Sequence, residues 1–152
     1  MQNEIEDAIS KVIKSEKWSV SNETRDLNAI QKEITLTNGK IVKVIIDIKN
    51  ERILIKNTFK ITPDFGNHVI GSLKTNLKEE FKMFLMPMDI YIQTDIIDPD
   101  LDTVHMIYCL YFDEFSKNKF YHAIYKIGDI PDLLSLMEKE FIDYHESPPS
   151  PS

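Results

Sequence analysis

Residues 30–59, IQKEITLTNGKIVKVIIDIKNERILIKNTF, set the architecture of the chain. They contain three runs rich in β-branched residues, separated by Thr37-Asn38-Gly39 and by Lys49-Asn50-Glu51. β-Branched residues favour strands, and short polar segments with Asn and Gly favour turns. The pattern therefore predicts an antiparallel meander of three strands.

The first turn can be predicted from the alternation of side chains. A two-residue Asn38-Gly39 loop would set the apolar residues of the second strand against a polar row of the first. A three-residue loop that ends with Gly39 in the left-handed conformation of a bulge removes this conflict. Glu33 then pairs with Lys43 on one face. The apolar residues share the other face: Ile30, Ile34, Leu36, Val42, Val44 and Ile46.

The second turn predicts a different connection and leaves an incomplete polar face. A two-residue Asn50-Glu51 loop would pair Ile48 with Ile53 and Ile46 with Ile55. On the opposite face, large aliphatic side chains interrupt the charged residues, and these are Ile41, Ile45 and Leu54. Such a face needs cover from a helix, a tail or a second subunit. We therefore take Ile41, Ile45 and Leu54 as the candidate interface.

Length, composition and charge limit the class of protein. A chain of 152 residues that is 42% hydrophobic suits one domain with a sizeable core, expected over residues 1–146. The net charge of −7 argues against a nucleic-acid partner, which needs a basic surface. Residues 1–60 carry a net charge of +2, whereas residues 61–152 carry −9. The apolar runs are too short to cross a bilayer and the N-terminus lacks a signal-peptide core, so we expect a cytoplasmic protein without a membrane partner.

Helical periodicity and turn residues predict the elements around the meander. Apolar residues at helical spacing predict a first helix over residues 4–16, capped by Asn3. Trp18 and Val20 leave it in extended form, and residues 21–26 are predicted to be a polar connection. A long helix should begin near Thr62-Pro63-Asp64 and end at Pro87.

The second half predicts two more strands and two C-terminal helices. A strand is expected at 88–97, and the run at 104–112, apolar on both faces, predicts a strand inside the sheet. Ser116 can cap a helix, with Phe115 and Phe120 as its hydrophobic staple and Gly128 at its end. Pro131 should open a final helix. Residues 147–152, SPPSPS, predict a disordered Pro/Ser tail.

These elements define an α+β fold class. An antiparallel sheet, made of the three-strand meander and two further strands, should be packed by an N-terminal helix, a long central helix and two C-terminal helices. The element order, the size and the acidic balance resemble the class I type III secretion chaperone-like fold. They also resemble small uncharacterised bacterial and archaeal proteins of similar architecture. The chaperone resemblance implies a homodimer that binds extended partner segments through apolar surface.

No sequence motif identifies a reaction. Asp98, Asp100 and Asp102 match the opening of a calcium loop, but Thr103 and Cys109 occupy positions that need glycine and glutamate. Cys109, the single cysteine, lies mid-strand in an apolar run, where a cysteine is usually an inert small hydrophobe. The histidines show no metal-ligand spacing: His68, His105, His122 and His145. We therefore expect no catalytic residue, no cofactor and no metal.

Two classes of function remain after these exclusions. The first is a non-enzymatic protein-binding or chaperone-like module, a homodimer whose peptide or protein partner would lie along a sheet edge or beside the final helix. The competing structural account is that Trp18, Val20 or the first helix covers the candidate interface within one chain. The second class is an enzyme whose site is assembled from residues distant in sequence.

Overall fold

The structure, a computed structural model, describes residues 1–61, 71–93 and 103–146 of the chain. In chain order its main elements are α1 (Gln2–Ser15), β1 (Ser19–Arg25), β2 (Ala29–Thr35), β3 (Ile41–Asp47), β4 (Arg52–Lys60), α3 (Gly71–Leu85), β5 (Ile90–Ile92), β6 (Thr103–Tyr111) and α4 (Lys117–Glu146). Short 3-10 helices, η1 (Met86–Met88) and η2 (Phe112–Glu114), precede β5 and α4. This combination of helices with an antiparallel sheet confirms the predicted α+β class.

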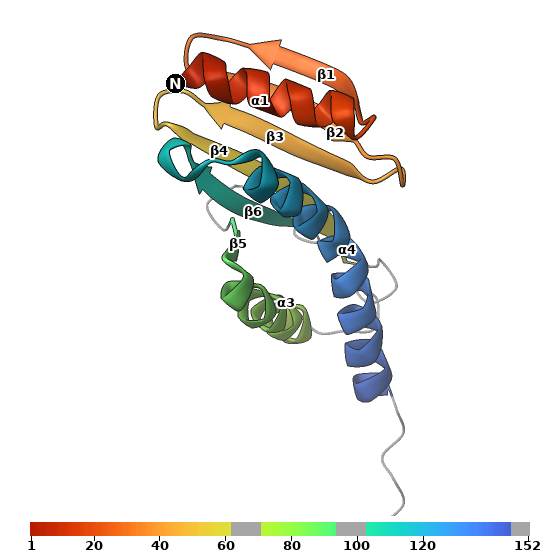
Figure 1. Ribbon diagram of the computed structural model, residues 1–152. Coiled ribbons are helices and arrows are strands. Elements are labelled where there is room, and N and C mark those ends of the chain that lie inside the picture. The colour runs from red at the N-terminus through yellow and green to blue at the C-terminus, as the bar shows by residue number, and fades with distance from the viewer. Residues whose placement is uncertain (62–70, 94–102, 147–152) are drawn as a thin grey trace, which may run out of the picture.

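The strands form one antiparallel sheet in the order β1-β2-β3-β4-β6-β5 (Figure 1). β2, β3 and β4 are the predicted meander. β6 is an interior strand as predicted, since it pairs with β4 on one side and with β5 on the other. β5 covers three residues of the strand expected at 88–97, and residues 94–97 lie outside the described part. The predicted helix start at 62–64, the calcium-like turn at 98–102 and the tail at 147–152 also lie outside it.

The β2–β3 hairpin confirms the predicted register. Glu33 pairs with Lys43, and Ile34 pairs with Val42. Gly39 has φ +86°, and its N–H donates to the Leu36 carbonyl at 3.0 Å. The Leu36 N–H donates to the Lys40 carbonyl at 2.8 Å, which closes the three-residue loop. The apolar alternation of both strands is therefore satisfied by one bulge.

The β3–β4 turn differs from the prediction by two residues. Ile46 pairs with Ile53, and Asp47 pairs with Arg52, so the loop contains four residues. Asp47 explains this register, because its carboxylate accepts a hydrogen bond from Arg52 Nε at 2.9 Å and one from the Asn50 side chain at 2.9 Å. A shift of two residues keeps every side chain on its predicted face. The candidate interface therefore remains on one face.

β1 is an additional edge strand where a polar connection was predicted. All seven of its residues are exposed, so it lacks the apolar alternation of a half-buried strand. Its register shifts between Val20 and Asn22. Backbone pairing with β2 holds it, together with ion pairs: Glu23 lies 3.2 Å from the buried Lys32 of β2, and Arg25 pairs with Glu6 of α1.

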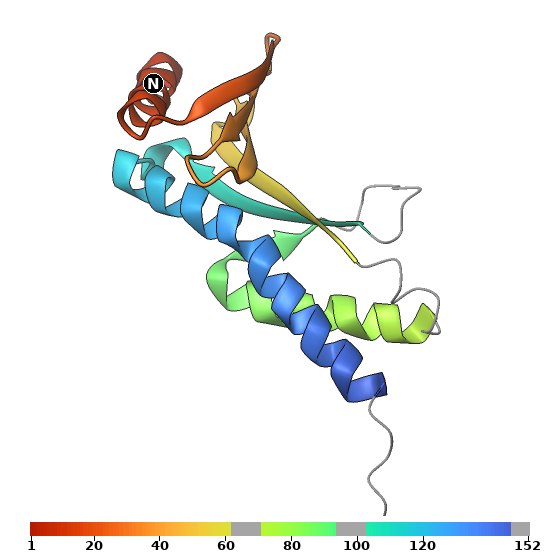
Figure 2. The ribbon, with the colours of Figure 1, turned by 90° about the vertical axis from the view of Figure 1, so that its right-hand side faces the viewer.

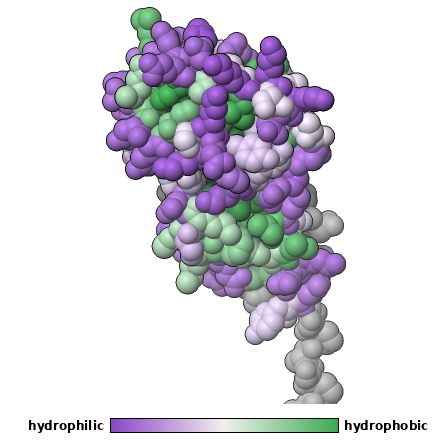
Figure 3. Space-filling model, in the orientation of Figure 1, coloured by the Kyte–Doolittle hydropathy of each residue, from purple (hydrophilic) through white to green (hydrophobic). Residues whose placement is uncertain are grey.

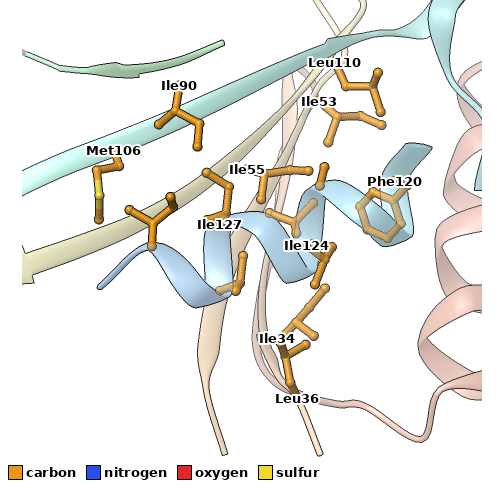
Figure 4. Close-up of a cluster of buried hydrophobic side chains, with 14 of the residues drawn as sticks. Ile34, Leu36, Ile53, Ile55, Ile90, Met106, Leu110, Phe120, Ile124 and Ile127 are labelled. Atoms are coloured by element: carbon orange, nitrogen blue, oxygen red, sulfur yellow. The ribbon is translucent and has the colours of Figure 1, made fainter. Parts of the chain in front are cut away.

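The described helices α1, α3 and α4 lie on one side of the sheet (Figure 2). Each contributes buried side chains to a single core with the inward residues of the strands. In Figure 4, Phe120, Ile124 and Ile127 of α4 lie beside Ile53 and Ile55 of β4. The core thus forms between one face of the sheet and these helices, and the opposite face of the sheet receives no helix from the described residues.

α1 begins earlier than predicted and ends by directing Trp18 inward. Its N-cap is Met1 rather than Asn3, because the helical bonding already starts with Ile5 N–H donating to the Met1 carbonyl at 3.1 Å. At the other end Lys17 has φ +59°, and Trp18 N–H donates to the Ile13 carbonyl at 3.0 Å. Trp18 is buried against Tyr121 and Tyr125 of α4, with ring centroids 6.2 and 5.7 Å away.

The start of α4 agrees with the prediction. Lys119 N–H donates to Ser116 Oγ at 3.1 Å, so Ser116 caps the first turn. The rings of Phe115 and Phe120 lie 6.1 Å apart, as expected of a hydrophobic staple.

The prediction of two C-terminal helices is wrong, because α4 runs unbroken for 30 residues and contains both Gly128 and Pro131. Gly128 does not end the helix; it is buried, and a Cβ there would lie 3.3 Å from Leu36 Cδ1. Pro131 has no N–H for the Ile127 carbonyl. Asn57 Nδ2 of β4 donates to that carbonyl at 3.1 Å instead. The sheet therefore supplies the hydrogen bond that proline removes.

Candidate functional site

The candidate interface residues lie together on the helix-free side of the sheet, which we call the outer face. Ile45 of β3 pairs with Leu54 of β4, and Leu54 pairs with Cys109 of β6. Neighbouring strands therefore place these three side chains in one row across the sheet. Ile41 projects from the same side of β3, four residues before Ile45. Ile41 is 50% exposed, and Ile45 and Leu54 are partly buried.

Trp18, Val20 and α1 do not cover this row, contrary to the competing account. Trp18 packs against α4 on the opposite side of the sheet. Val20 pairs with Ile34, whose side chain is in the core. α1 contributes Ile5 and Ile9 to the same core. The described N-terminal segment is therefore used to complete the core rather than to shield the outer face.

The charged residues of the outer face have both signs. Asp47 and Arg52 bind each other at one end of the apolar row. Although partial burial disfavours the Asp47 carboxylate, hydrogen bonds from Asn50 and Arg52 hold its pKa below the ordinary value. The same Asp47–Arg52 hydrogen bond raises the pKa of Arg52. This pair is locally neutral and stabilises the turn.

A shallow hollow adjoins the apolar row on its other side. It encloses about 410 Å³, and its lining includes Glu33, Lys43, Lys56 and His105. Lys43 and Lys56 are direct partners across β3 and β4. Like charges directly opposite each other are unfavourable in a sheet, and Glu33, which pairs with Lys43 across β2 and β3, places a carboxylate beside them.

The structure does not bring the other chemical candidates together. Cys109 lies within β6, on the outer face beside Leu54, and is partly buried. The run around it is buried mainly on one side, because only alternate residues face the helices. His105 is on β6, whereas His122 is exposed on α4. Within residues 1–61, 71–93 and 103–146, no group of His, Cys, Asp and Glu has an arrangement that could hold a metal ion.

A second exposed apolar region lies away from the sheet. Five large hydrophobic side chains on α3, η1 and the distal half of α4 are exposed: Met83, Met86, Leu133, Leu136 and Tyr144. Tyr144 also lines a hollow of about 430 Å³, together with Glu80, Met137, Glu140 and Phe141. Residue spacing alone gives no sign of this hollow, because Glu80 on one wall and Met137 on the other are more than fifty residues apart. None of the helices that the structure describes is long and apolar enough to span a membrane.

The molecule is a small α+β protein in which an antiparallel sheet carries helices on one face. Two solved structures share this fold. An uncharacterised protein from Methanothermobacter thermautotrophicus has a TM-score of 0.71 at 18% sequence identity, over 90% of this chain and 97% of that chain. YbjN from E. coli, described as "a putative transcription regulator", has a TM-score of 0.50 at 12% identity, over 92% of each chain.

Neither a family model nor a curated protein sequence matches the chain. At these identities the two likenesses show the fold alone. They agree with the expected resemblance to small bacterial and archaeal proteins of similar architecture.

Proposed function

We propose that the chain is a non-enzymatic protein-binding module that forms a homodimer through the outer face of its sheet. The observation that carries the proposal is the one-sided arrangement of the described helices, which leaves the row of Ile45 and Leu54 without a helix above it. A two-fold related copy is the commonest way to cover such a row. The outer face carries both Glu33 and Lys43, so its charges permit self-association.

The size of the outer face sets the expected strength of the dimer. The sheet order has five strand-to-strand intervals, which span about 24 Å, and a seven-residue strand such as β3 spans about 24 Å. The two copies together would then bury roughly 1,200 Å², the lower end of specific interfaces. Covering the exposed half of Ile41 and the remaining surface of Ile45 and Leu54 adds about 1 kcal/mol for each side chain. We therefore expect a micromolar dimer rather than an obligate one.

The comparisons support a binding role. YbjN is described as "a putative transcription regulator". The resemblance of the element order to class I type III secretion chaperones implies a homodimer that binds partner segments. For this chain we propose only the general mode of action, which is binding to another protein without catalysis. A peptide or protein partner would bind to this homodimer.

Sedimentation equilibrium of three proteins tests the proposal. The wild type should be a dimer at about 100 μM, a concentration well above a micromolar dissociation constant. Ile45→Lys should be monomeric and folded, because it places an unpaired charge in the apolar row. Leu27→Lys is the matched control, since Leu27 is 94% exposed in the β1–β2 turn, and it should remain a dimer.

Two results would defeat the dimer. One is a wild type that stays monomeric over the whole concentration range. The other is an Ile45→Lys variant that unfolds in circular dichroism, which would mean that the same chain covers this row. A Leu27→Lys variant that also dissociates would indicate a charge effect without a defined interface.

A further inference from the structure

We infer that the hollow between α3 and the distal half of α4 is a docking groove for a basic amphipathic helix of a partner protein. The region is separate from the outer face and from the sheet, as Figure 2 shows for the crossing of the two helices below the strands. Binding in this groove would not depend on the dimer.

The groove begins where α4 leaves the sheet. Gly128 packs beside Leu36 and Val42, and the Ile127 carbonyl is bound by Asn57, so α4 is anchored up to this point. Beyond Pro131 the helix continues for 15 residues with α3 beside it. Only part of this distal half is buried, with Leu134, Glu138 and Phe141 turned inward.

The groove wall on α4 is an apolar stripe that the described chain leaves exposed. Leu133 and Met137 are four residues apart, as are Leu136 and Glu140, so they lie on one side of the helix. Leu136 is 61% exposed and Tyr144 is 79% exposed. From α3, Met83 is 71% exposed, one turn from Glu80. Figure 3 shows this apolar surface continuing across α3 and the distal part of α4.

The dimensions fit one helix. From Leu133 to Tyr144 the stripe rises about 17 Å along α4, which matches three turns of a partner helix. Methionine side chains at such a surface adapt to different apolar partners, and here Met137 of α4 lines the hollow while Met83 is exposed on α3. An amphipathic helix lays an apolar stripe of this length into a groove through residues spaced three and four apart.

The charge of the groove selects the partner. Among the described residues that line it, the charged ones are Glu80 and Glu140, and both are acidic and exposed. Lys82 and Lys139 belong to the same helices but are not among these lining residues. A partner helix with lysine or arginine beside its apolar stripe would complement these carboxylates, and an acidic one would be repelled.

Fluorescence anisotropy with two synthetic peptides tests the inference on the full chain. Both are leucine-faced helices of about 14 residues, one flanked by lysine and the other by glutamate. The lysine peptide should bind one to one with micromolar affinity, and the glutamate peptide at least about tenfold more weakly. Glu80→Lys combined with Glu140→Lys should weaken the lysine peptide about tenfold, because two exposed contacts reverse sign.

Matched variants separate binding in the groove from attraction by net charge. Asp113→Lys combined with Glu114→Lys makes the same change in net charge at exposed residues before α4, and should leave binding unchanged. Leu136→Gln should weaken binding without unfolding the protein, since Leu136 is exposed beside the hollow, one turn before its lining residue Glu140. Ile45→Lys should retain full binding, because Ile45 lies on the outer face and does not line the groove.

Three outcomes would overturn the inference. The first is no binding of the lysine peptide. The second is an equal loss of binding in the Asp113/Glu114 and Glu80/Glu140 variants, which would indicate attraction by net charge alone. The third is a wild-type dimer that dissociates on Leu136→Gln but not on Ile45→Lys, because a second copy would then occupy the groove.

Discussion

Replacing Asn57 by alanine tests how α4 remains continuous through Pro131. The Asn57 side chain donates to the Ile127 carbonyl at 3.1 Å, and Pro131 cannot supply the usual helical donor. The variant leaves that acceptor unpaired at a partly buried site, so we expect a loss of about 1–2 kcal/mol in the free energy of unfolding. For a domain of this size the melting temperature should fall by roughly 3–8 °C.

A double-mutant cycle makes this prediction specific. In Pro131→Ala the new N–H can donate to Ile127, so the Asn57 side chain becomes redundant. Asn57→Ala should then cost less than about 0.5 kcal/mol, which gives a coupling energy of about 1 kcal/mol. Urea unfolding followed by far-ultraviolet circular dichroism measures all four proteins, with unchanged m-values as the check on the native state.

Equal costs of Asn57→Ala in the two backgrounds would refute the reasoning. Asn57 would then stabilise the fold only through its other hydrogen bond, in which its Oδ1 accepts from the Thr58 N–H at 2.8 Å. Asn118→Ala is the control, because Asn118 is an exposed residue of α4. This substitution should change the free energy of unfolding by less than about 0.5 kcal/mol.

Three further predictions concern stability. Ser116→Ala should cost about 1 kcal/mol in urea unfolding through loss of the α4 cap, whereas Ser135→Ala, exposed within the helix, should be neutral or slightly stabilising. Gly39→Val should cost about 2 kcal/mol or more because Gly39 has φ +86°, and Gly39→Asn should cost less because asparagine tolerates this conformation; equal losses would contradict the bulge. Because the folded pKa of Asp47 is lowered, its contribution is present above the unfolded pKa and lost as pH falls through the folded pKa; Asp47→Asn should flatten the stability profile below about pH 4, and an unchanged profile would contradict this.

The meander was predictable because its signals are local. Alternation across Ile34 and Val42 allows one register, and Gly39 supplies the conformation that this register needs. The same alternation placed Ile41, Ile45 and Leu54 on the face opposite the core. The local sequence pattern did not predict the register of the β3–β4 turn, because the hydrogen bond between the side chains of Asp47 and Arg52 determines which residues pair there.

The errors arise from contacts between distant segments. Gly128 and Pro131 are helix-ending residues in local terms, but Leu36, Val42 and Asn57 supply an environment that keeps α4 intact. β1 depends on pairing with β2 and on ion pairs, so it carries no apolar pattern to detect. The hollow at Glu80 and Glu140 requires the placement of two helices, which spacing within either helix does not reveal.

The packing of α4 also orders events during synthesis on the ribosome. Trp18 is buried against Tyr121 and Tyr125, Lys40 binds Asp129 across 89 residues, and Asn57 binds Ile127 across 70. The first four strands therefore emerge long before the helix that covers them. At about 5–20 residues per second, the nascent meander waits roughly 4–17 s for residues 62–146 to be translated. Throughout that interval the part of its core face that α4 later covers, which includes Ile53 and Ile55, is open to other nascent chains and to chaperones.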